Sequence, residues 1–256
     1  MLLAGGTDIF PAYVQKNLPK PVLDVSQIEE MRGIVRGESG WRIGGATTWT
    51  EIARAELPPA FAGLQQAARQ IGARQVQNRG TIAGNLCNAS PAADGVPPLL
   101  TLDAQVELSS QAGQRRLPLA DFITGYRRTA RREDEILTAI HVPQQAAQGT
   151  ASFVKLGARS HLVISIVMVA VRLERAEDGA ITTARIAVGA AADRARRLTA
   201  LEADVIGKAV ENASAAISPQ HLSPLAPIDD VRATAAYRRD AAITLLRDAL
   251  NRAERG

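Results

Sequence analysis

The segment RGTIAGNLCNASPAAD, residues 79–94, constrains the fold of this chain more strongly than any other stretch. Its residues are small or hydrogen-bonding, and almost none of its side chains suits a base or a nucleophile. Because glycine has no Cβ, such a segment lets the backbone approach a ligand or another backbone closely. A related segment, Gly5-Gly6-Thr7-Asp8, follows the apolar residues 1–4, which predicts a short strand that enters a tight turn.

Both glycine segments present consecutive backbone N–H groups with little side-chain bulk, an arrangement that can form a concave anion site. The hydroxyls of Thr7 and Thr81 and the amide of Asn85 add hydrogen-bonding groups, so two such sites could hold the two phosphates of a pyrophosphate. Asp94 is acidic and suits a ribose hydroxyl or a polarised N–H, although it could equally cap a helix that begins near Pro97. Neither a Walker lysine motif nor a GxGxxG motif indicates one of the usual nucleotide-binding folds.

Periodicity along the chain predicts an α+β fold. A capping-box spacing from Thr48 to Glu51 indicates the start of one helix, and Pro58 opens a longer apolar segment of helical spacing. Strands are expected at residues 22–25, 41–46, 104–110, 115–119, 134–143, 151–157, 162–174 and 181–190, and helices after them, the last with an apolar stripe at Ile243, Leu246 and Leu250. Because residues 144–150 are typical of a linker, we predict a domain over 1–145 and a second over 150–256, with a small antiparallel sheet and helices.

The cysteine and histidine content excludes several kinds of site. Cys87 is the only cysteine, so the chain has no internal disulfide and no CxxC metal or iron–sulfur site. His141, His161 and His221 are far apart in the sequence and do not indicate a metal site. No apolar run is long enough to span a membrane, and with no signal peptide before the first motif a cytoplasmic location is expected.

Four arginines, Arg127, Arg128, Arg131 and Arg132, form a basic cluster. Neither interleaved aromatic residues nor a basic face accompanies them, so nucleic-acid binding is not expected. We interpret them as solvated side chains or as contacts to a partner subunit.

The order of five motifs is more specific than any one of them. LLAGGTDIFP, IGGATTWTEI, GARQVQNRGTIAGNLCNASPAAD, GYRRTARREDEILTAIHVP and FVKLGARSHLVISIVMVAV follow one another over nearly the whole chain. In this order the chain closely resembles the FAD-binding subunit or domain of the molybdenum hydroxylases, a family that includes medium subunits of carbon monoxide and aldehyde dehydrogenases and the middle domain of xanthine dehydrogenase. The resemblance implies an FAD-binding domain of the PCMH (vanillyl-alcohol-oxidase-like) type and a C-terminal domain like that of carbon monoxide dehydrogenase flavoproteins.

The resemblance also implies an oxidoreductase role in electron transfer. The expected cofactor is FAD, while the molybdenum cofactor and two [2Fe–2S] clusters would lie on a large and a small partner subunit, in a dimer of heterotrimers. Electrons would pass from the clusters to the flavin and on to NAD, oxygen or a quinone. This role agrees with the absence of a recognisable set of acid, base and nucleophile.

The resemblance also implies a role for individual residues. The first glycine turn and the second glycine segment would contact the FAD pyrophosphate, Leu137 would pack against the flavin or adenine, and Lys155 would contact the cofactor unless it is a strand lysine that faces solvent. The implied FAD contacts are Leu3, Ala4, Gly5, Gly6, Thr7, Asp8, Ile9, Thr81, Gly84, Asn85, Asn88, Asp94, Leu137 and Lys155.

The sequence departs from the family pattern in two places. Ala83 stands where the family usually has glycine, which is tolerable if φ is negative there. Family members carry a further strand and helix before the first glycine turn, whereas Met1 here directly precedes LLAGG, so these elements are expected to be missing from the first domain. Two alternatives therefore stand beside the electron-transfer subunit: an assembly module that has lost FAD, and a stand-alone FAD oxidase.

Overall fold

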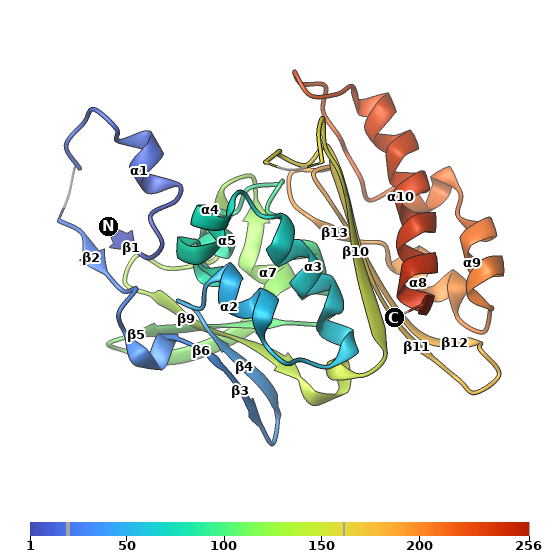
Figure 1. Cartoon of the computed structure of the whole chain (residues 1–256), viewed down its shortest axis with the longest axis horizontal. Coiled ribbons are helices and arrows are strands. Elements are labelled where there is room, and N and C mark those ends of the chain that lie inside the picture. The colour runs from blue at the N-terminus through green and yellow to red at the C-terminus, as the bar shows by residue number, and fades with distance from the viewer. Residues whose placement is uncertain (19–20, 161, 256) are drawn as a thin grey trace.

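The computed structural model describes residues 1–18, 21–160 and 162–255, so His161 of the sequence analysis lies outside the described residues. Two larger antiparallel sheets form the framework, with helices packed around them (Figure 1). The α+β fold expected from the sequence is confirmed.

The strands are β1 (Leu2–Leu3), β2 (Leu23–Asp24), β3 (Ile34–Gly37), β4 (Gly40–Gly44), β5 (Gln105–Ser110), β6 (Gly113–Pro118), β7 (Ile123–Gly125), β8 (Arg128–Thr129), β9 (Ile136–Pro143), β10 (Thr150–Leu156), β11 (Val167–Arg175), β12 (Ile181–Gly189) and β13 (Arg196–Arg197). The α-helices are α1 (Ile9–Ala12), α2 (Trp49–Arg54), α3 (Ala62–Gln70), α4 (Arg74–Arg79), α5 (Ile82–Asn88), α6 (Val96–Thr101), α7 (Leu119–Phe122), α8 (Thr199–Val205), α9 (Val210–Ala216) and α10 (Ala235–Arg255). Short 3₁₀ turns lie at Glu29–Met31, Pro59–Phe61, Gln144–Ala147 and Pro219–Leu222.

The first sheet has the order β3-β4-β9-β5-β6 and is antiparallel throughout. On one face Ile43 lies opposite Ile140, and Val106 lies opposite the same residue from the other side. All three side chains are fully buried, in a core that also holds Trp49 and Phe61. These residues mark the face of the sheet that packs against α2, α3 and α5, whose buried apolar residues belong to the same core.

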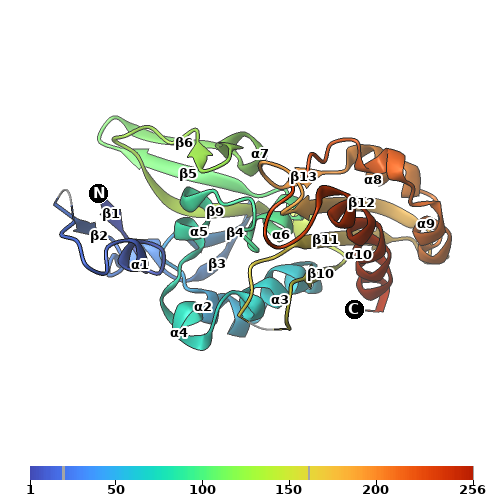
Figure 2. The same cartoon turned by 90° about the horizontal axis from the view of Figure 1, so that it is seen from above.

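The second sheet has the order β10-β11-β12-β13 and is covered on both faces (Figures 1 and 2). Helices α3 and α6 lie on one side of it, and α8 and α10 on the other. Strand β11 is accordingly buried from Val167 to Leu173, as expected for a strand without a solvent face. The apolar stripe of α10 packs on this sheet, where Leu246 and Leu250 are fully buried.

Local sequence signals located several elements correctly and misplaced one strand. Thr48 caps α2 with the reciprocal capping-box bonds, and β5 and β6 form the expected hairpin. The strand expected from residue 162 begins only at Val167, because the preceding residues turn so that Ser165 reaches a buried carboxylate, Asp94. No helix among the described residues is both long and apolar enough to cross a membrane.

Candidate functional site

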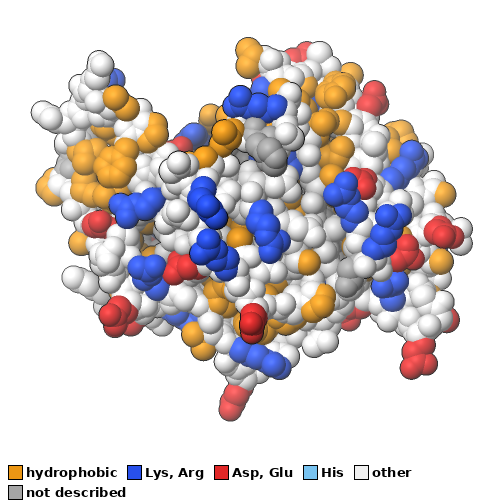
Figure 3. All heavy atoms as spheres, in the orientation of Figure 1, with side chains coloured by type: hydrophobic (Ala, Val, Ile, Leu, Met, Phe, Trp, Pro, Cys, Tyr) orange, Lys and Arg blue, Asp and Glu red, His pale blue; other side chains and the backbone are white. Residues whose placement is uncertain are grey.

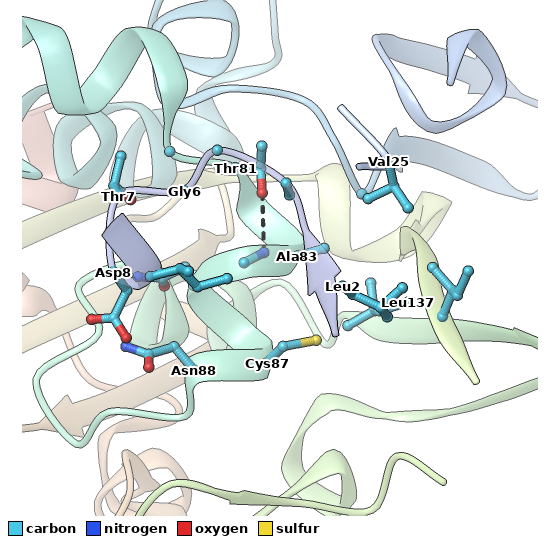
Figure 4. A pocket seen from close by; sticks show the side chains of 18 of the residues that line it. Leu2, Gly6, Thr7, Asp8, Val25, Thr81, Ala83, Cys87, Asn88 and Leu137 are labelled. Carbon is cyan, nitrogen blue, oxygen red and sulfur yellow. Dashed lines mark hydrogen bonds between the residues drawn. The ribbon is translucent and has the colours of Figure 1, made fainter. Parts of the chain in front are cut away.

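A cavity of about 670 Å³ lies between the N-terminal segment and α5 (Figure 4). Polar groups of Thr7, Asp8 and Asn88 gather at one end of it, and the apolar side chains of Leu2, Val25 and Leu137 at the other. A cavity with one polar and one apolar end suits a ligand that joins a charged group to a flat ring.

Two glycines bring the N-terminal turn against the rest of the site. A Cβ on Gly5 would lie 1.8 Å from the carbonyl oxygen of Arg79, so only glycine fits where this turn meets the end of α4. Gly6 has φ +71°, a backbone conformation that is strained for residues other than glycine. The turn therefore depends on both glycines, one for close approach and one for its backbone angle.

The N-terminal turn keeps its backbone donors free. The N–H groups of residues 5–8 make no hydrogen bond with any described residue, although the turn lies on the cavity. Consecutive free N–H groups around a positive φ form a nest that binds anions. The turn therefore has unused backbone donors, which an anion site there would require.

The second glycine segment differs from its expected form, because it is a helix rather than an open turn. Thr81 is the N-cap of α5, and its hydroxyl oxygen accepts a hydrogen bond from the N–H of Gly84 at 3.1 Å. The N–H groups of Ile82 and Ala83 donate to the carbonyls of Thr47 and Gly45. The expectation of a second anion-binding turn here is wrong. The backbone N–H groups of residues 82–84 already donate to the Thr81 hydroxyl and to carbonyls of the neighbouring loop.

The second segment instead contributes space and one unsatisfied amide. Gly84 is exposed to the cavity, and a Cβ added there would meet only the hydroxyl of Thr81, at 3.0 Å. The side-chain oxygen of Asn85 is buried without a hydrogen-bond partner among the described residues. Ala83 has the negative φ of a helical residue, so its methyl group is tolerated as expected.

A smaller cavity of about 370 Å³ adjoins the first, and the two share Ile71, Val76 and Asn85 in their walls. Asp94 and Lys155 line this second cavity and not the main one. Lys155 donates to Asp94 at 2.5 Å and is only 6% exposed, so it is not a lysine that faces solvent. Asp94 does not cap α6 either, because that helix has Gly95 at its N-cap and no side-chain cap.

Burial sets the chemistry of Asp94. Removal from water raises the pKa of its carboxyl group, while Lys155 and the hydroxyl of Ser165 act in the opposite direction by favouring the carboxylate. The Ser165 hydroxyl donates to the second carboxylate oxygen at 2.5 Å. Both oxygens of Asp94 are therefore already engaged within the protein.

The structure gathers most of the predicted residues but not all. Leu3 does not line the main cavity, because it pairs with Asp24 in the parallel β1–β2 ladder. The predicted residues that do line it are Ala4, Gly5, Gly6, Thr7, Asp8, Ile9, Thr81, Gly84, Asn85, Asn88 and Leu137. Among the residues that the sequence interpretation missed are two of the clustered arginines, Arg127 and Arg131, which lie on the cavity. Their membership of the GYRRTARREDEIL motif was the available signal.

An ion pair between the half-buried Arg115 and the buried Glu135 fixes the segment that carries these arginines. Glu135 accepts two hydrogen bonds from Arg115, at 2.6 and 2.9 Å, and one from the backbone N–H of Arg132 at 2.7 Å. The hydrogen bonds from Arg115 lower the pKa of Glu135 to about 2. Arg115 also donates to the carbonyl of Ala130, which holds the segment against β6.

The arrangement favours a dinucleotide over a metal ion. No group of His, Cys, Asp and Glu side chains among the described residues could hold a metal ion. Lys and Arg side chains are spread over the face shown in Figure 3, with Asp and Glu side chains between them. The cavity pair offers an anion nest, apolar walls and a buried ion pair.

Two sequence families match the chain. Residues 1–145 match the FAD binding domain in molybdopterin dehydrogenase, and residues 152–253 match the CO dehydrogenase flavoprotein C-terminal domain.

Individual proteins of the same kind are similar along nearly the whole length. The chain is 32% identical over 262 residues to the xanthine dehydrogenase FAD-binding subunit of Escherichia coli O157:H7, covering 98% of this chain and 88% of the relative. It is 30% identical to the carbon monoxide dehydrogenase medium chain of Hydrogenophaga pseudoflava, with the same coverage. In solved structures, carbon monoxide dehydrogenase from Oligotropha carboxidovorans has a TM-score of 0.89 at 26% identity, covering 99% of this chain and 89% of the other.

Proposed function

The chain belongs to the FAD-binding flavoproteins of the molybdopterin dehydrogenases, an oxidoreductase family, and we propose that it binds one FAD across its two adjoining cavities. The observation that carries the proposal is the set of unpartnered N–H groups of residues 5–8, in a turn that lines the same cavity as Gly84. A diphosphate there would accept hydrogen bonds from these N–H groups, which donate to no described residue.

Three further features of the site fit a flavin dinucleotide. The unpartnered oxygen of Asn85 lies where the two cavities meet and would accept a hydrogen bond from a hydroxyl of the cofactor. Leu2, Val25 and Leu137 form an apolar end for one ring system, and the second cavity has apolar walls at Leu162 and Val163 for the other. These features support binding of the cofactor along a path from Leu137 to Lys155.

The proposed roles of the site residues follow this path. Residues 4–9 hold the diphosphate through their backbone, Gly84 leaves room for it, and Thr81 donates its free hydroxyl hydrogen. Asn88 contacts the same region from the end of α5, and Lys155 and Asp94 face the cofactor from the second cavity. Leu3 has no contact in this proposal, because it pairs with Asp24 and does not line the cavity.

The bound FAD supplies the redox chemistry, and the protein supplies position and electrostatics. We propose that the chain is the electron-transfer subunit of a molybdenum-containing dehydrogenase, with the molybdenum cofactor and [2Fe–2S] clusters on partner subunits. A heterotrimer, present twice, is the expected assembly. NAD, oxygen or a quinone is the expected acceptor.

The two alternatives predict different behaviour. A stand-alone oxidase needs a base beside its substrate, and among the described residues the main cavity has no histidine or glutamate and only Asp8 as an acid. An assembly module without FAD would have no use for the free donors and the unpartnered amide of the cavity. Both observations favour the electron-transfer subunit.

A flavin titration tests the proposal. The purified chain should bind added FAD with a change in flavin fluorescence and then show the visible flavin bands after gel filtration. A chain that stays colourless and leaves FAD fluorescence unchanged would support the assembly module. Reduction of the bound flavin by an organic substrate without partner subunits would support the oxidase.

The boundaries 1–145 and 150–256 and the cytoplasmic location remain predictions. Limited proteolysis near residues 144–150 would test the first. The 3₁₀ turn Gln144–Ala147 and the start of β10 occupy this segment, where Ala146 is fully buried.

A further inference from the structure

Arg127 has an unusual backbone conformation beside the main cavity. It lies in the turn between β7 and β8 with φ +50°, where glycine or asparagine is the usual residue because other side chains are strained. Its N–H donates at 3.0 Å to the carbonyl of Ala89, the left-handed residue that ends α5. The hairpin turn is thereby fixed to the end of the helix that carries Gly84.

The side chain of Arg127 joins the two glycine segments. Its Nη1 donates to the side-chain oxygen of Asn88 at 2.6 Å and lies 3.5 Å from the carboxylate of Asp8. Asn88 closes α5, and Asp8 ends the N-terminal turn. One guanidinium group therefore spans the polar end of the cavity, from one half of the proposed cradle to the other.

Charge at this end of the cavity is otherwise unfavourable for a diphosphate. The acidic side chain of Asp8 lines the cavity, and only two cationic side chains, Arg127 and Arg131, line it among the described residues. Arg131 uses its Nη1 on the backbone carbonyls of its own segment, at residues 132, 133 and 135. Both arginines make their described side-chain hydrogen bonds through Nη1 alone, but only Arg127 makes them to the two glycine segments, so its unused Nε and Nη2 are the ones held at the proposed cradle.

We propose that Arg127 is the cationic ligand of the FAD diphosphate and the residue that neutralises Asp8 beside it. This inference rests on the proposed function and adds a side chain that the glycine motifs do not contain. Arginine suits the role because its fork can hold Asn88 and a phosphate oxygen at the same time. The strained conformation at this position is then explained by a requirement for the guanidinium group rather than by the turn.

Ligand binding by the whole chain tests the inference. We expect Arg127→Gln to weaken FAD and ADP binding about ten- to a hundredfold, since a hydrogen bond to a charged group is lost. Adenosine, which lacks the diphosphate, should bind the variant as it binds the unaltered chain. Arg128→Gln is the matched control, because Arg128 is the exposed neighbour in the same hairpin and does not line the cavity.

A second variant separates charge from backbone strain. Arg127→Gly removes the guanidinium but suits the left-handed conformation, so it should weaken ADP as much as Arg127→Gln without lowering thermal stability. The inference is overturned if Arg127→Gln binds FAD as tightly as Arg128→Gln does, or if it weakens adenosine as much as ADP. Failure of the unaltered chain to bind FAD would overturn the proposed function, and this inference with it.

Discussion

The Nζ of Lys155 lies 2.5 Å from Oδ2 of Asp94, and each side chain is only 6% exposed. Removal of one partner from a buried ion pair leaves an uncompensated charge, which typically costs about 3–5 kcal/mol. We therefore expect Lys155→Met to lower the free energy of unfolding by several kcal/mol. Denaturant titration measures the loss.

The double variant Asp94→Asn/Lys155→Met provides the contrast. It removes both charges and should recover much of the stability, because a neutral amide is less costly to bury than a lone carboxylate. Lys16→Met, at an exposed position, controls for the loss of one lysine. Equal destabilisation by Lys155→Met and by the double variant would contradict a coupled pair.

Gly84 offers a way to fill the main cavity without breaking the fold. Gly84 lines the cavity, and a Cβ there would meet only the capping hydroxyl of Thr81, in a tight contact of 3.0 Å that a small shift of that side chain relieves. We expect Gly84→Leu to abolish FAD binding while circular dichroism and thermal unfolding stay close to those of the unaltered chain. Glycine inside a helix is itself unfavourable by up to about 1 kcal/mol, so the substitution does not weaken α5 through propensity.

Gly5→Ala is the informative comparison for this variant. Its Cβ would overlap the carbonyl of Arg79, so it should displace the N-terminal turn and lose FAD together with stability. Undiminished FAD binding by Gly84→Leu would exclude the cavity as the cofactor site.

Local signals in the sequence predicted much of the fold because they act over short distances. The capping box at Thr48, the hairpin around residues 111–114 and the stripe of α10 each involve neighbours along the chain or along one helix. Most of the FAD contacts that the family motifs imply also line the cavity. The prediction of these contacts came from the order of the motifs along the chain, because no single residue indicates FAD by its own chemistry.

Contacts between distant segments explain what the sequence did not predict. The glycines at 5–6 and at 84 appear equivalent, yet only the first keeps free N–H groups, because residues 45 and 47 accept from the N–H groups at the start of α5. The resemblance implies a cofactor contact for Lys155, but nothing in the sequence predicts its ion pair with Asp94, which lies 61 positions away. Arg127 itself adopts a left-handed backbone conformation. A sequence predicts that conformation reliably only at glycine and asparagine.

Glu135 predicts a specific loss of stability in acid. Its pKa in the folded protein is about 2, below the ordinary value of 4.5, so its contribution is fully present above the ordinary value and disappears as the pH falls toward 2. Glu135→Gln should lower the free energy of unfolding by about 1–3 kcal/mol at pH 7. The variant should also lose less stability than the unaltered chain between pH 5 and about pH 3.

Denaturant titrations at several pH values measure this difference. Asp121→Asn, at an exposed position on α7, is a control that also removes one carboxylate. Parallel pH profiles for Glu135→Gln and the unaltered chain would show that the ion pair with Arg115 contributes nothing to acid sensitivity.

Cys87 gives a chemical test of where the cofactor lies. Its sulfur lies along the main cavity between the polar and apolar ends, and desolvation there raises the pKa of the thiol to about 11, although the residue is exposed to the cavity (Figure 4). At pH 8 the thiolate fraction is then well below that of an ordinary cysteine, so alkylation by iodoacetamide should be slow. Raising the pH toward 10 should accelerate the reaction, and saturating FAD should suppress it even there by covering the sulfur. Mass spectrometry of the modified chain measures both effects, and an alkylation rate that FAD leaves unchanged would mean that the cofactor does not pass over α5.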